Sequence, residues 1–410
     1  MKLSLSYLLN TDYFKNSLKL VSGTVVGQVL TLAVAPILSR LYGAEDFGVL
    51  ALFNSWVGVL IILSTLRLEM GLVVASDKVE ARNLFRNIYK LIFCFSGAVL
   101  LISVAAYLLV ETPRWSLFLF LGILFQALFM LLSYDCNRDK AYRNISFSKV
   151  IQSLSNAGVA ILGGYLAWKH WGLLAANLIG FLAALVYLFR GRAEKIAGIK
   201  LFNFQKFKKE TEPFKEFPKY NLPASFLDTL SQHLPVFALS HFFSTAITGY
   251  YSLAMKVLLL PLALVGNAVG QVFYQKLTEM ENTFYKRRLV CFTWGALFLL
   301  GIMPFSCLYL WGPDLFAFVF GEPWRESGKI AAALSPMLLV MFMSSPTSTA
   351  FIVVKQQKYN FIFGVTGTLY RSAAFYYGWV MGDFYLGIKV WVVCEYIQIF
   401  FYNAILWRKM

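Results

Sequence analysis

The fold is decided by residues 20–69, which read LVSGTVVGQVLTLAVAPILSRLYGAEDFGVLALFNSWVGVLIILSTLRLE. The stretch opens with an apolar run of about twenty residues, long enough to cross the hydrocarbon core of a bilayer. A short polar break at 40–46 follows, and a second, longer apolar run begins after it. Arg67 and Glu69 stand near the end of that second run, where hydrocarbon disfavours charge. The stretch therefore predicts two membrane-spanning helices joined by a short loop.

The whole chain has the composition of an integral membrane protein. Of its 410 residues, 59% are apolar and 14% are charged, a balance outside the range of soluble domains. Because hydrocarbon offers no hydrogen-bond partners, each apolar segment must pair its own backbone groups, so an all-α fold is expected. Twelve transmembrane helices are predicted, at 20–41, 47–75, 91–110, 115–134, 147–168, 171–189, 222–243, 247–274, 289–311, 330–354, 361–381 and 385–407.

Basic residues gather on one side of these spans. With the N-terminus placed in the cytoplasm, 28 of the 37 Lys and Arg residues lie in inner loops and ends, five lie outside, and the remainder lie within spans. This bias follows the positive-inside rule through all twelve spans. The net charge of +16 is therefore interpreted as a signal of topology, and no nucleic-acid partner is expected.

An internal repeat divides the chain. The segment SRLYGAEDFGVLALF at 39–53 is echoed 201 residues later by SHFFSTAITGYYSLA at 240–254, which aligns Ser39 with Ser240, Gly48 with Gly249, and Leu52 with Leu253. The repeat predicts an N-terminal six-helix bundle at 1–190 and a C-terminal six-helix bundle at 220–410. Six is an even number, so both copies point the same way, and a pseudo-two-fold axis along the membrane normal is expected.

A basic segment at 191–219 joins the two predicted bundles. It is rich in Lys, Phe and Glu and carries Pro213 and Pro218 near its end. We expect a cytoplasmic, solvated tether that lies on anionic lipid head groups, in preference to a regulatory site. The five cysteines of the chain form no metal-ligand spacing, so they are interpreted as small core residues and no metal site is expected.

Three ordered motifs carry a family resemblance. The pattern GT…Q…PILSRLY…DFG at 23–48 resembles the start of Wzx-type flippases, the polysaccharide repeat-unit exporters of the multidrug/oligosaccharidyl-lipid/polysaccharide (MOP) superfamily. LRLE at 66–69 resembles the Arg-x-Glu that closes their second helix, and FGEPWRESG at 320–328 resembles the stretch before their tenth helix. The likeness covers essentially the whole chain. One departure is that His241 stands at the repeat position of Arg40.

The resemblance implies a function and a setting. It implies a non-enzymatic, multi-pass protein of the bacterial inner membrane that moves undecaprenyl-diphosphate-linked oligosaccharide repeat units, for O-antigen or another glycan, from the cytoplasmic to the periplasmic leaflet. Alternating access driven by a proton or sodium gradient is expected, with no cofactor. Membrane lipids are expected partners, together with polymerase and chain-length proteins of the same pathway.

Ionisable residues at or near the predicted spans are the candidate site residues. Each costs about 2.5–3.5 kcal/mol at mid-membrane, so it is expected to face a partner or a wet cavity. The cations suit a diphosphate, because guanidinium donors match phosphate oxygens. The substrate-binding candidates are Arg67, Arg371, Lys256 and Arg40, and the ion-coupling candidates are Glu69, Asp228 and Glu395. The alternatives are interhelical ion pairs for Arg67 and Arg371, and snorkelling for Lys256 and Lys389.

Arg67 and Glu69 are expected to act separately. On a continuous helix, residues two apart point to nearly opposite faces and cannot pair. We therefore expect Arg67 to face the substrate cavity, and Glu69 to face a neighbouring helix or to carry a coupling proton.

Two other function classes remain open on the sequence. A drug or other lipid exporter of the same superfamily is one, although drug exporters favour acidic cavities for cations. A polytopic polymerase or glycosyltransferase is the other, but the longest predicted outer loop, 312–329, holds no histidine and no DxD motif.

The charge bias makes a topology prediction. Both termini and the 191–219 segment should be cytoplasmic, because inner loops hold the excess of Lys and Arg. Alkaline phosphatase fused after Phe189 or Trp407 should therefore be inactive, whereas a fusion after Thr112 should be active. An active phosphatase at either inner site would contradict the orientation.

Overall fold

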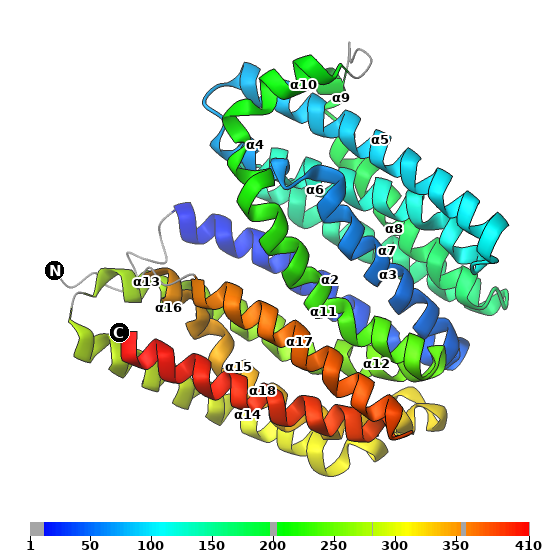
Figure 1. Cartoon of the computed structure of the whole chain (residues 1–410), viewed down its shortest axis with the longest axis vertical. Coiled ribbons are helices and arrows are strands. Elements are labelled where there is room, and N and C mark those ends of the chain that lie inside the picture. The colour runs from blue at the N-terminus through cyan, green and yellow to red at the C-terminus, as the bar shows by residue number, and fades with distance from the viewer. Residues whose placement is uncertain (1–11, 197–202, 281, 354–357, 410) are drawn as a thin grey trace. The chain divides into compact units, whose positions relative to one another are not determined.

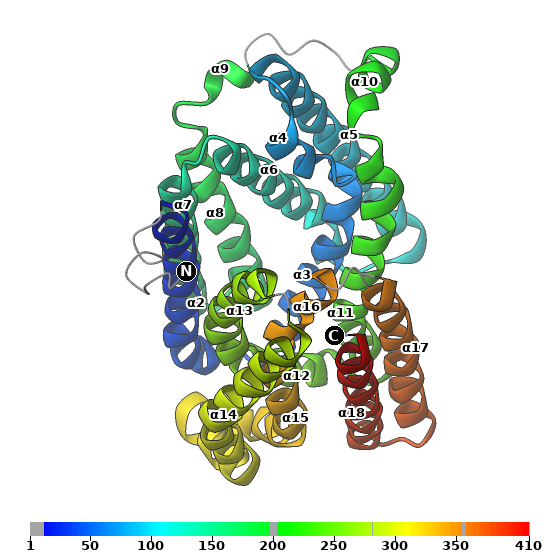
Figure 2. The same cartoon turned by 90° about the vertical axis from the view of Figure 1, so that its left-hand side faces the viewer.

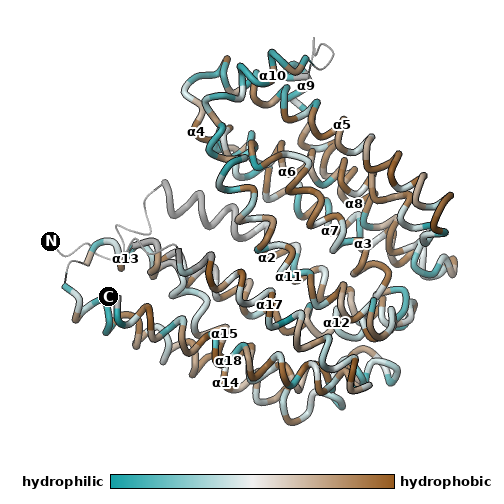
Figure 3. Tube along the Cα trace, viewed as in Figure 1, coloured by the Kyte–Doolittle hydropathy of each residue, from teal (hydrophilic) through white to brown (hydrophobic). Residues whose placement is uncertain are grey.

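The computed structural model describes residues 12–196, 203–280, 282–353 and 358–409, and these parts of the chain contain helices and no strands (Figure 1). Each of the twelve predicted spans falls on a helix or a helix with short helical extensions. Eight helices are long and apolar enough to cross a membrane, and Val25–Leu41 is a shorter apolar segment. Figure 3 shows hydrophobic colour along the helices and hydrophilic colour mainly at their ends. The all-α membrane fold is confirmed.

The helices form two compact units. Unit 1 comprises Met1–Val34 and Phe53–Thr229, and unit 2 comprises Ala35–Leu52 and Leu230–Met410. The helices α2 (Asp12–Leu41), α3 (Ala44–Thr65) and α11 (Leu222–Phe242) therefore each contribute residues to both units. The predicted boundaries at 190 and 220, and the symmetry axis between the bundles, remain predictions.

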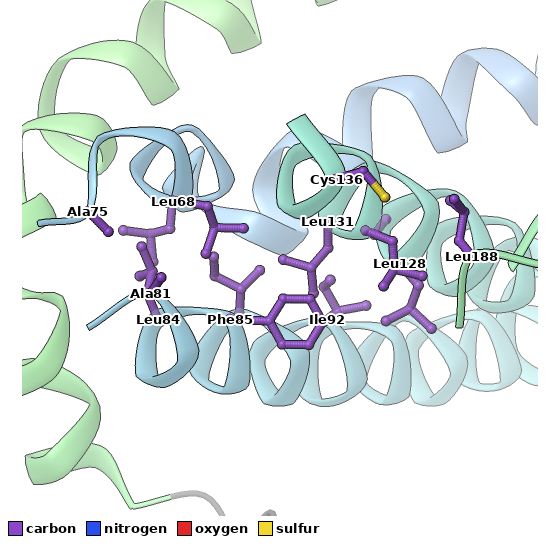
Figure 4. Packing of buried hydrophobic residues seen from close by; sticks show 14 of the residues in the cluster. Leu68, Ala75, Ala81, Leu84, Phe85, Ile92, Leu128, Leu131, Cys136 and Leu188 are labelled. Carbon is purple, nitrogen blue, oxygen red and sulfur yellow. The ribbon is translucent and has the colours of Figure 1, made fainter. Parts of the chain in front are cut away.

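Unit 1 is built around α5 (Lys78–Val110), α6 (Leu119–Arg138), α7 (Tyr142–Tyr165) and α8 (His170–Phe189). The helix α5 begins at Asp77, whose carboxylate accepts hydrogen bonds from the backbone N–H groups of Val79 and Glu80, both at 2.7 Å. Buried side chains from α5 and α6 interlock in one apolar cluster, in which Phe85 and Leu131 are at most 1% exposed (Figure 4). This cluster also takes in Leu68, which anchors the short helices after α3.

The segment after α8 is helical over most of its described residues. It forms α9 (Ala193–Ile196), α10 (Phe204–Thr211), η3 (Glu212–Phe214) and the π-helical turn η4 (Phe217–Asn221). Phe214 is buried in the unit 1 cluster, and Glu210 accepts a hydrogen bond from the Asn87 amide at 2.8 Å. Phe207, Phe214 and Phe217 pack on the apolar core of unit 1, whereas the lysines among them are exposed, and the cytoplasmic placement of this segment stays a prediction.

Unit 2 holds α12 (Thr245–Pro261), α14 (Thr283–Phe320), α15 (Arg325–Ser344), α17 (Lys358–Val380) and α18 (Phe384–Lys409). Figure 2 shows α14 beside α15 and α17 beside α18, and both pairs are in contact. After Pro261 the chain forms the π-helical turn η5 (Leu262–Gly266) and then α13 (Asn267–Glu279), so this span is interrupted just after a proline. Pro346 likewise lies in the 3₁₀ segment η7 (Ser345–Thr349), between α15 and α16 (Ala350–Val353).

Two of the sequence motifs meet inside unit 2. The indole N–H of Trp324, in η6 (Glu322–Trp324), donates to the Ser39 carbonyl oxygen at 2.8 Å, and the Ser39 hydroxyl donates to the Phe320 carbonyl oxygen at the same distance. The Phe47 ring packs edge-on against Trp324 with centroids 4.9 Å apart. The PILSRLY…DFG and FGEPW segments thus stabilise each other through a buried contact.

The repeat appears as a reciprocal contact between α3 and α12. A Cβ atom added to Gly48 would lie 1.9 Å from the Thr245 carbonyl oxygen, and one added to Gly249 would lie 1.8 Å from the Ala44 carbonyl oxygen. The 201-residue repeat relates Gly48 to Gly249 and Ala44 to Thr245, so each of the two contacts is the repeat counterpart of the other. The first turns of α3 and α12 therefore cross with local two-fold symmetry, and glycine is required at both crossing points.

Adding a methyl group at the crossing should destabilise the protein. Gly48→Ala or Gly249→Ala forces two backbones apart, and overpacking of this kind costs about 1–3 kcal/mol. Each variant should lower the unfolding temperature in detergent and reduce membrane abundance. Gly97→Ala on α5 is the control, because an added Cβ there has nothing within 4 Å. Unchanged stability of both crossing variants would contradict this close approach.

Candidate functional site

The helix that carries Arg67 is broken in front of it. The span predicted at 47–75 is not one helix: α3 ends at Thr65, and it is followed by η1 (Leu68–Met70) and α4 (Gly71–Val74). Leu66 and Arg67 adopt left-handed backbone angles, with φ of 53° and 60°. Such a conformation costs an L-residue about 1–2 kcal/mol. Burial of Leu68 and Leu72 in the unit 1 core holds the break in place.

The break brings Arg67 and Glu69 together. The Arg67 Nη1 atom donates to Glu69 Oε1 at 3.2 Å. The prediction that the two residues cannot pair is therefore wrong, because it assumed a continuous helix and the left-handed turn reverses the direction of one side chain. Their predicted separation into two independent partners is wrong for the same reason.

Only some of the polar side-chain atoms of this pair are hydrogen-bonded. The Glu69 side chain is completely buried, whereas 22% of the Arg67 side chain is exposed. Glu69 Oε2 and Arg67 Nε are both buried and have no hydrogen-bond partner within the described parts of the chain. Thr65 lies beside the carboxylate but outside hydrogen-bond geometry. A buried carboxylate oxygen without a donor is costly when ionised, so this site favours a proton or a further donor.

A second guanidinium–carboxylate pair lies in unit 2, and it is fully satisfied. Arg371 of α17 donates hydrogen bonds to Glu395 of α18, with Nη2 at 3.0 Å from Oε1 and 3.1 Å from Oε2. The Tyr370 hydroxyl and the Trp391 indole N–H also donate to Oε2, at 2.6 and 2.9 Å. Arg371 Nη1 donates to the Ser231 hydroxyl of α11 at 2.9 Å. The pair therefore joins three helices.

Aromatic side chains pack around the Glu395 end of this second pair. Glu395 is 3% exposed, and the Trp391 ring one turn before it packs on Phe375 and Tyr251 with centroids 5.6 and 6.3 Å apart. Arg371 donates from Nε, Nη1 and Nη2, and 16% of its side chain remains exposed. The structure thus shows the interhelical ion pair that the sequence left as the alternative for Arg371.

The other predicted residues do not join these pairs. Arg40 is exposed at the end of α2, and Asp228 is exposed on α11. Lys256 is half-buried on α12 and makes no hydrogen bond or ion pair with any residue that the structure describes. Lys389 is exposed near the start of α18.

Sequence reasoning missed a buried acid at the end of α6. Asp135 accepts from Lys195 Nζ at 2.7 Å and from Arg192 Nε at 3.0 Å, so it ties α6 to α9. Its position within an apolar span next to a basic loop was a usable signal. Within the described ranges, no group of three His, Cys, Asp or Glu side chains is arranged to hold a metal ion.

The chain resembles a known protein family and several solved structures. A family model described as "Polysaccharide biosynthesis protein" matches residues 37–329. No curated protein matches the chain. The fold is similar to that of the lipid II flippase MurJ in an inward closed conformation, with a TM-score of 0.71 and 15% identity over 93% of this chain and 86% of that one.

Other similar structures are transporters of the MOP superfamily. An inward-facing multidrug resistance MATE family transporter has a TM-score of 0.62 and 13% identity over 92% of this chain and 95% of that one. A MOP superfamily transporter from Pyrococcus furiosus has a TM-score of 0.58 and 14% identity over 97% of this chain and 98% of that one. These likenesses place the chain in the fold shared by MurJ and MATE transporters.

The closed pair in unit 2 makes a stability prediction. Arg371→Met or Glu395→Leu alone leaves one buried charge without its partner, which costs about 3–5 kcal/mol. Each single variant should therefore lose membrane abundance and unfold at a lower temperature. The double variant removes both charges and should recover most of the stability. Normal stability of either single variant would show that the pair does not hold these helices together.

Proposed function

The chain belongs to the polysaccharide biosynthesis protein family, and on this premise we propose that it is a flippase for undecaprenyl-diphosphate-linked oligosaccharide repeat units. It moves them from the cytoplasmic to the periplasmic leaflet of a bacterial inner membrane by alternating access. The apolar helices and the MurJ-like and MATE-like fold support a multi-pass transporter of a lipid-linked substrate. The undecaprenyl-diphosphate carrier itself is part of the proposal.

The proposal rests on the Arg67–Glu69 pair, in which Glu69 Oε2 and Arg67 Nε have no hydrogen-bond partner within the described chain. Arg67 is partly exposed and keeps donors to spare, and a guanidinium presents planar donors that match the oxygens of a diphosphate. Glu69 occupies one Arg67 donor through Oε1. When Glu69 accepts a proton on Oε2, its hold on Arg67 weakens and the guanidinium becomes available to the diphosphate. Deprotonation restores the pair and releases the substrate.

This exchange gives a route for ion coupling. Because the proton and the diphosphate are held in the same state, they cross together, and the complex of one proton with a doubly charged diphosphate carries a net negative charge. A membrane potential that is negative inside drives that charge outward with about 2.3 kcal/mol per 100 mV, which biases the alternating-access equilibrium toward export. The Glu395 carboxylate of the Arg371–Glu395 pair takes part in five hydrogen bonds, so this pair serves as the fixed element. Glu69 is thus the carboxylate assigned to the coupling proton, and Arg67 is the cation assigned to the diphosphate.

A drug exporter is the second candidate, because one similar structure is a multidrug resistance MATE transporter. Cationic drugs require a carboxylate that is free of a guanidinium, and Arg67 covers Glu69 on one side. Export of an ethidium-like cation by the reconstituted protein, without transport of a lipid diphosphate, would favour this candidate.

The experiment measures transport in proteoliposomes. A fluorescent undecaprenyl-diphosphate oligosaccharide is scored by its access to a membrane-impermeant quencher, with and without an imposed pH gradient. A gradient that is acidic on the side from which the substrate leaves should accelerate transport by the wild-type protein, because the proton is carried with the substrate. Glu69→Gln should keep normal abundance and lose that acceleration, whereas Arg67→Ala should reduce transport about tenfold or more at either condition.

Asp228→Asn is the matched control, since Asp228 is exposed and lies outside the pair. It should retain the acceleration. Loss of acceleration in Asp228→Asn but not in Glu69→Gln would move the coupling role to Asp228. Unaffected transport by Arg67→Ala at normal abundance would overturn the diphosphate assignment.

A further inference from the structure

The ends of α14 and α18 form a basic and aromatic corner of unit 2. Five buried apolar side chains from α13, α14 and α16 pack with Leu406 of α18, which is 0% exposed. Val290 and Leu406 belong to this cluster, so the residues just outside them, Arg287 and Trp407, are held side by side. Figure 1 shows the red end of α18 next to the yellow-green start of α14.

Arg287 is fixed at this corner with donors to spare. Its Nη2 atom donates to the Trp407 carbonyl oxygen at 3.0 Å, and its guanidinium carbon lies 5.2 Å from the centre of a Trp407 ring. These contacts cap the last turn of α18 and orient the guanidinium plane. Arg287 Nε is buried and has no hydrogen-bond partner within the described part of the chain. An oriented guanidinium with an unused, buried donor is suited to an oxyanion.

The surroundings of Arg287 are strongly basic. Lys286 and Arg288 flank it in sequence, Arg408 follows Trp407, and Lys276 lies near the end of α13. Within the described residues of 273–290 and 402–409, the only carboxylate is that of Glu279. The start of α14 adds the positive end of its helix dipole, and the Asn282 side chain accepts from the Phe284 backbone N–H there. The corner therefore attracts a singly or doubly charged anion.

The aromatic side chains indicate where that anion comes from. Phe284, Tyr285 and Trp407 are 67%, 55% and 39% exposed, although they end helices that are otherwise apolar. Trp and Tyr at such a position lie at the boundary between hydrocarbon and head groups. A basic site at that depth meets the phosphodiester of a phospholipid, and free phosphate has no apolar part to place against these rings.

We propose that Arg287, with Lys286, Arg288 and Arg408, binds the head-group phosphate of an anionic phospholipid whose acyl chains lie against α14 and α18. The site is separate from the Arg67–Glu69 pair and does not depend on what the protein transports. The lipid bridges the ends of two helices that the apolar cluster already holds together. It is therefore a resident lipid site, at which phosphatidylglycerol is preferred over phosphatidylcholine because only the former leaves the phosphate charge uncompensated.

Trp407 provides the measurement. The full-length protein is reconstituted in vesicles that contain either brominated phosphatidylglycerol or brominated phosphatidylcholine at the same mole fraction, and tryptophan quenching is recorded. Subtracting the signal of Trp407→Phe isolates the contribution of Trp407. That contribution should be quenched several-fold more strongly by brominated phosphatidylglycerol. Equal quenching by the two lipids would overturn the proposal.

Two variants test the basic residues. Arg287→Gln, and the exposed Arg288→Gln as a variant without buried contacts, should each reduce the phosphatidylglycerol preference, Arg287→Gln by the larger factor. Lys389→Gln, an equal loss of charge near the other end of α18, should leave the preference intact. Millimolar inorganic phosphate should not compete. A preference that survives both arginine variants, that falls equally in Lys389→Gln, or that inorganic phosphate abolishes would contradict a phospholipid site at this corner.

Discussion

A charged side chain among apolar helices must find an opposite charge or lose its own, and this requirement shapes both units. In unit 2 the requirement is met in full: Glu395 receives the guanidinium of Arg371 and the N–H or O–H groups of Trp391 and Tyr370. In unit 1 it is met in part, because Glu69 has one partnered oxygen and one without a partner in the described chain. The same chemistry thus yields a carboxylate with both oxygens hydrogen-bonded in one place and a carboxylate with one hydrogen-bonded oxygen in the other.

The difference between the pairs follows from the backbone that supports them. Arg371 and Glu395 lie on regular helices, where neighbours one turn away supply extra donors. Arg67 and Glu69 lie two residues apart at a left-handed break, so a single short loop holds both partners and leaves little room for others. Strain of about 1–2 kcal/mol per left-handed residue is tolerated where surrounding packing enforces it. Here Leu68 and Leu72, buried in the unit 1 cluster, supply that packing.

The sequence was a good guide to the elements and a poor guide to their interruptions. Apolar length placed all twelve helical spans, and the 201-residue repeat located the two glycines that meet between α3 and α12. The Arg67–Glu69 contact was missed because helical periodicity contains no signal for two consecutive left-handed residues without glycine. The roles of Ser231, Tyr370 and Trp391 were missed because each is an ordinary polar or aromatic residue in an apolar segment. Only tertiary packing makes them partners of a charge.

The helix α3 belongs to unit 2 up to Leu52 and to unit 1 from Phe53 onward. A close crossing of two backbones demands glycine on both sides, and Gly48 and Gly249 meet that demand reciprocally. Trp324, hydrogen-bonded to Ser39 and packed on Phe47, then fixes the preceding loop to the end of α14. The motifs at the two ends of α3 thus meet different demands: the first is held by the glycine crossing and by Trp324, and the second carries the ion pair that, of the two pairs described, is incompletely hydrogen-bonded.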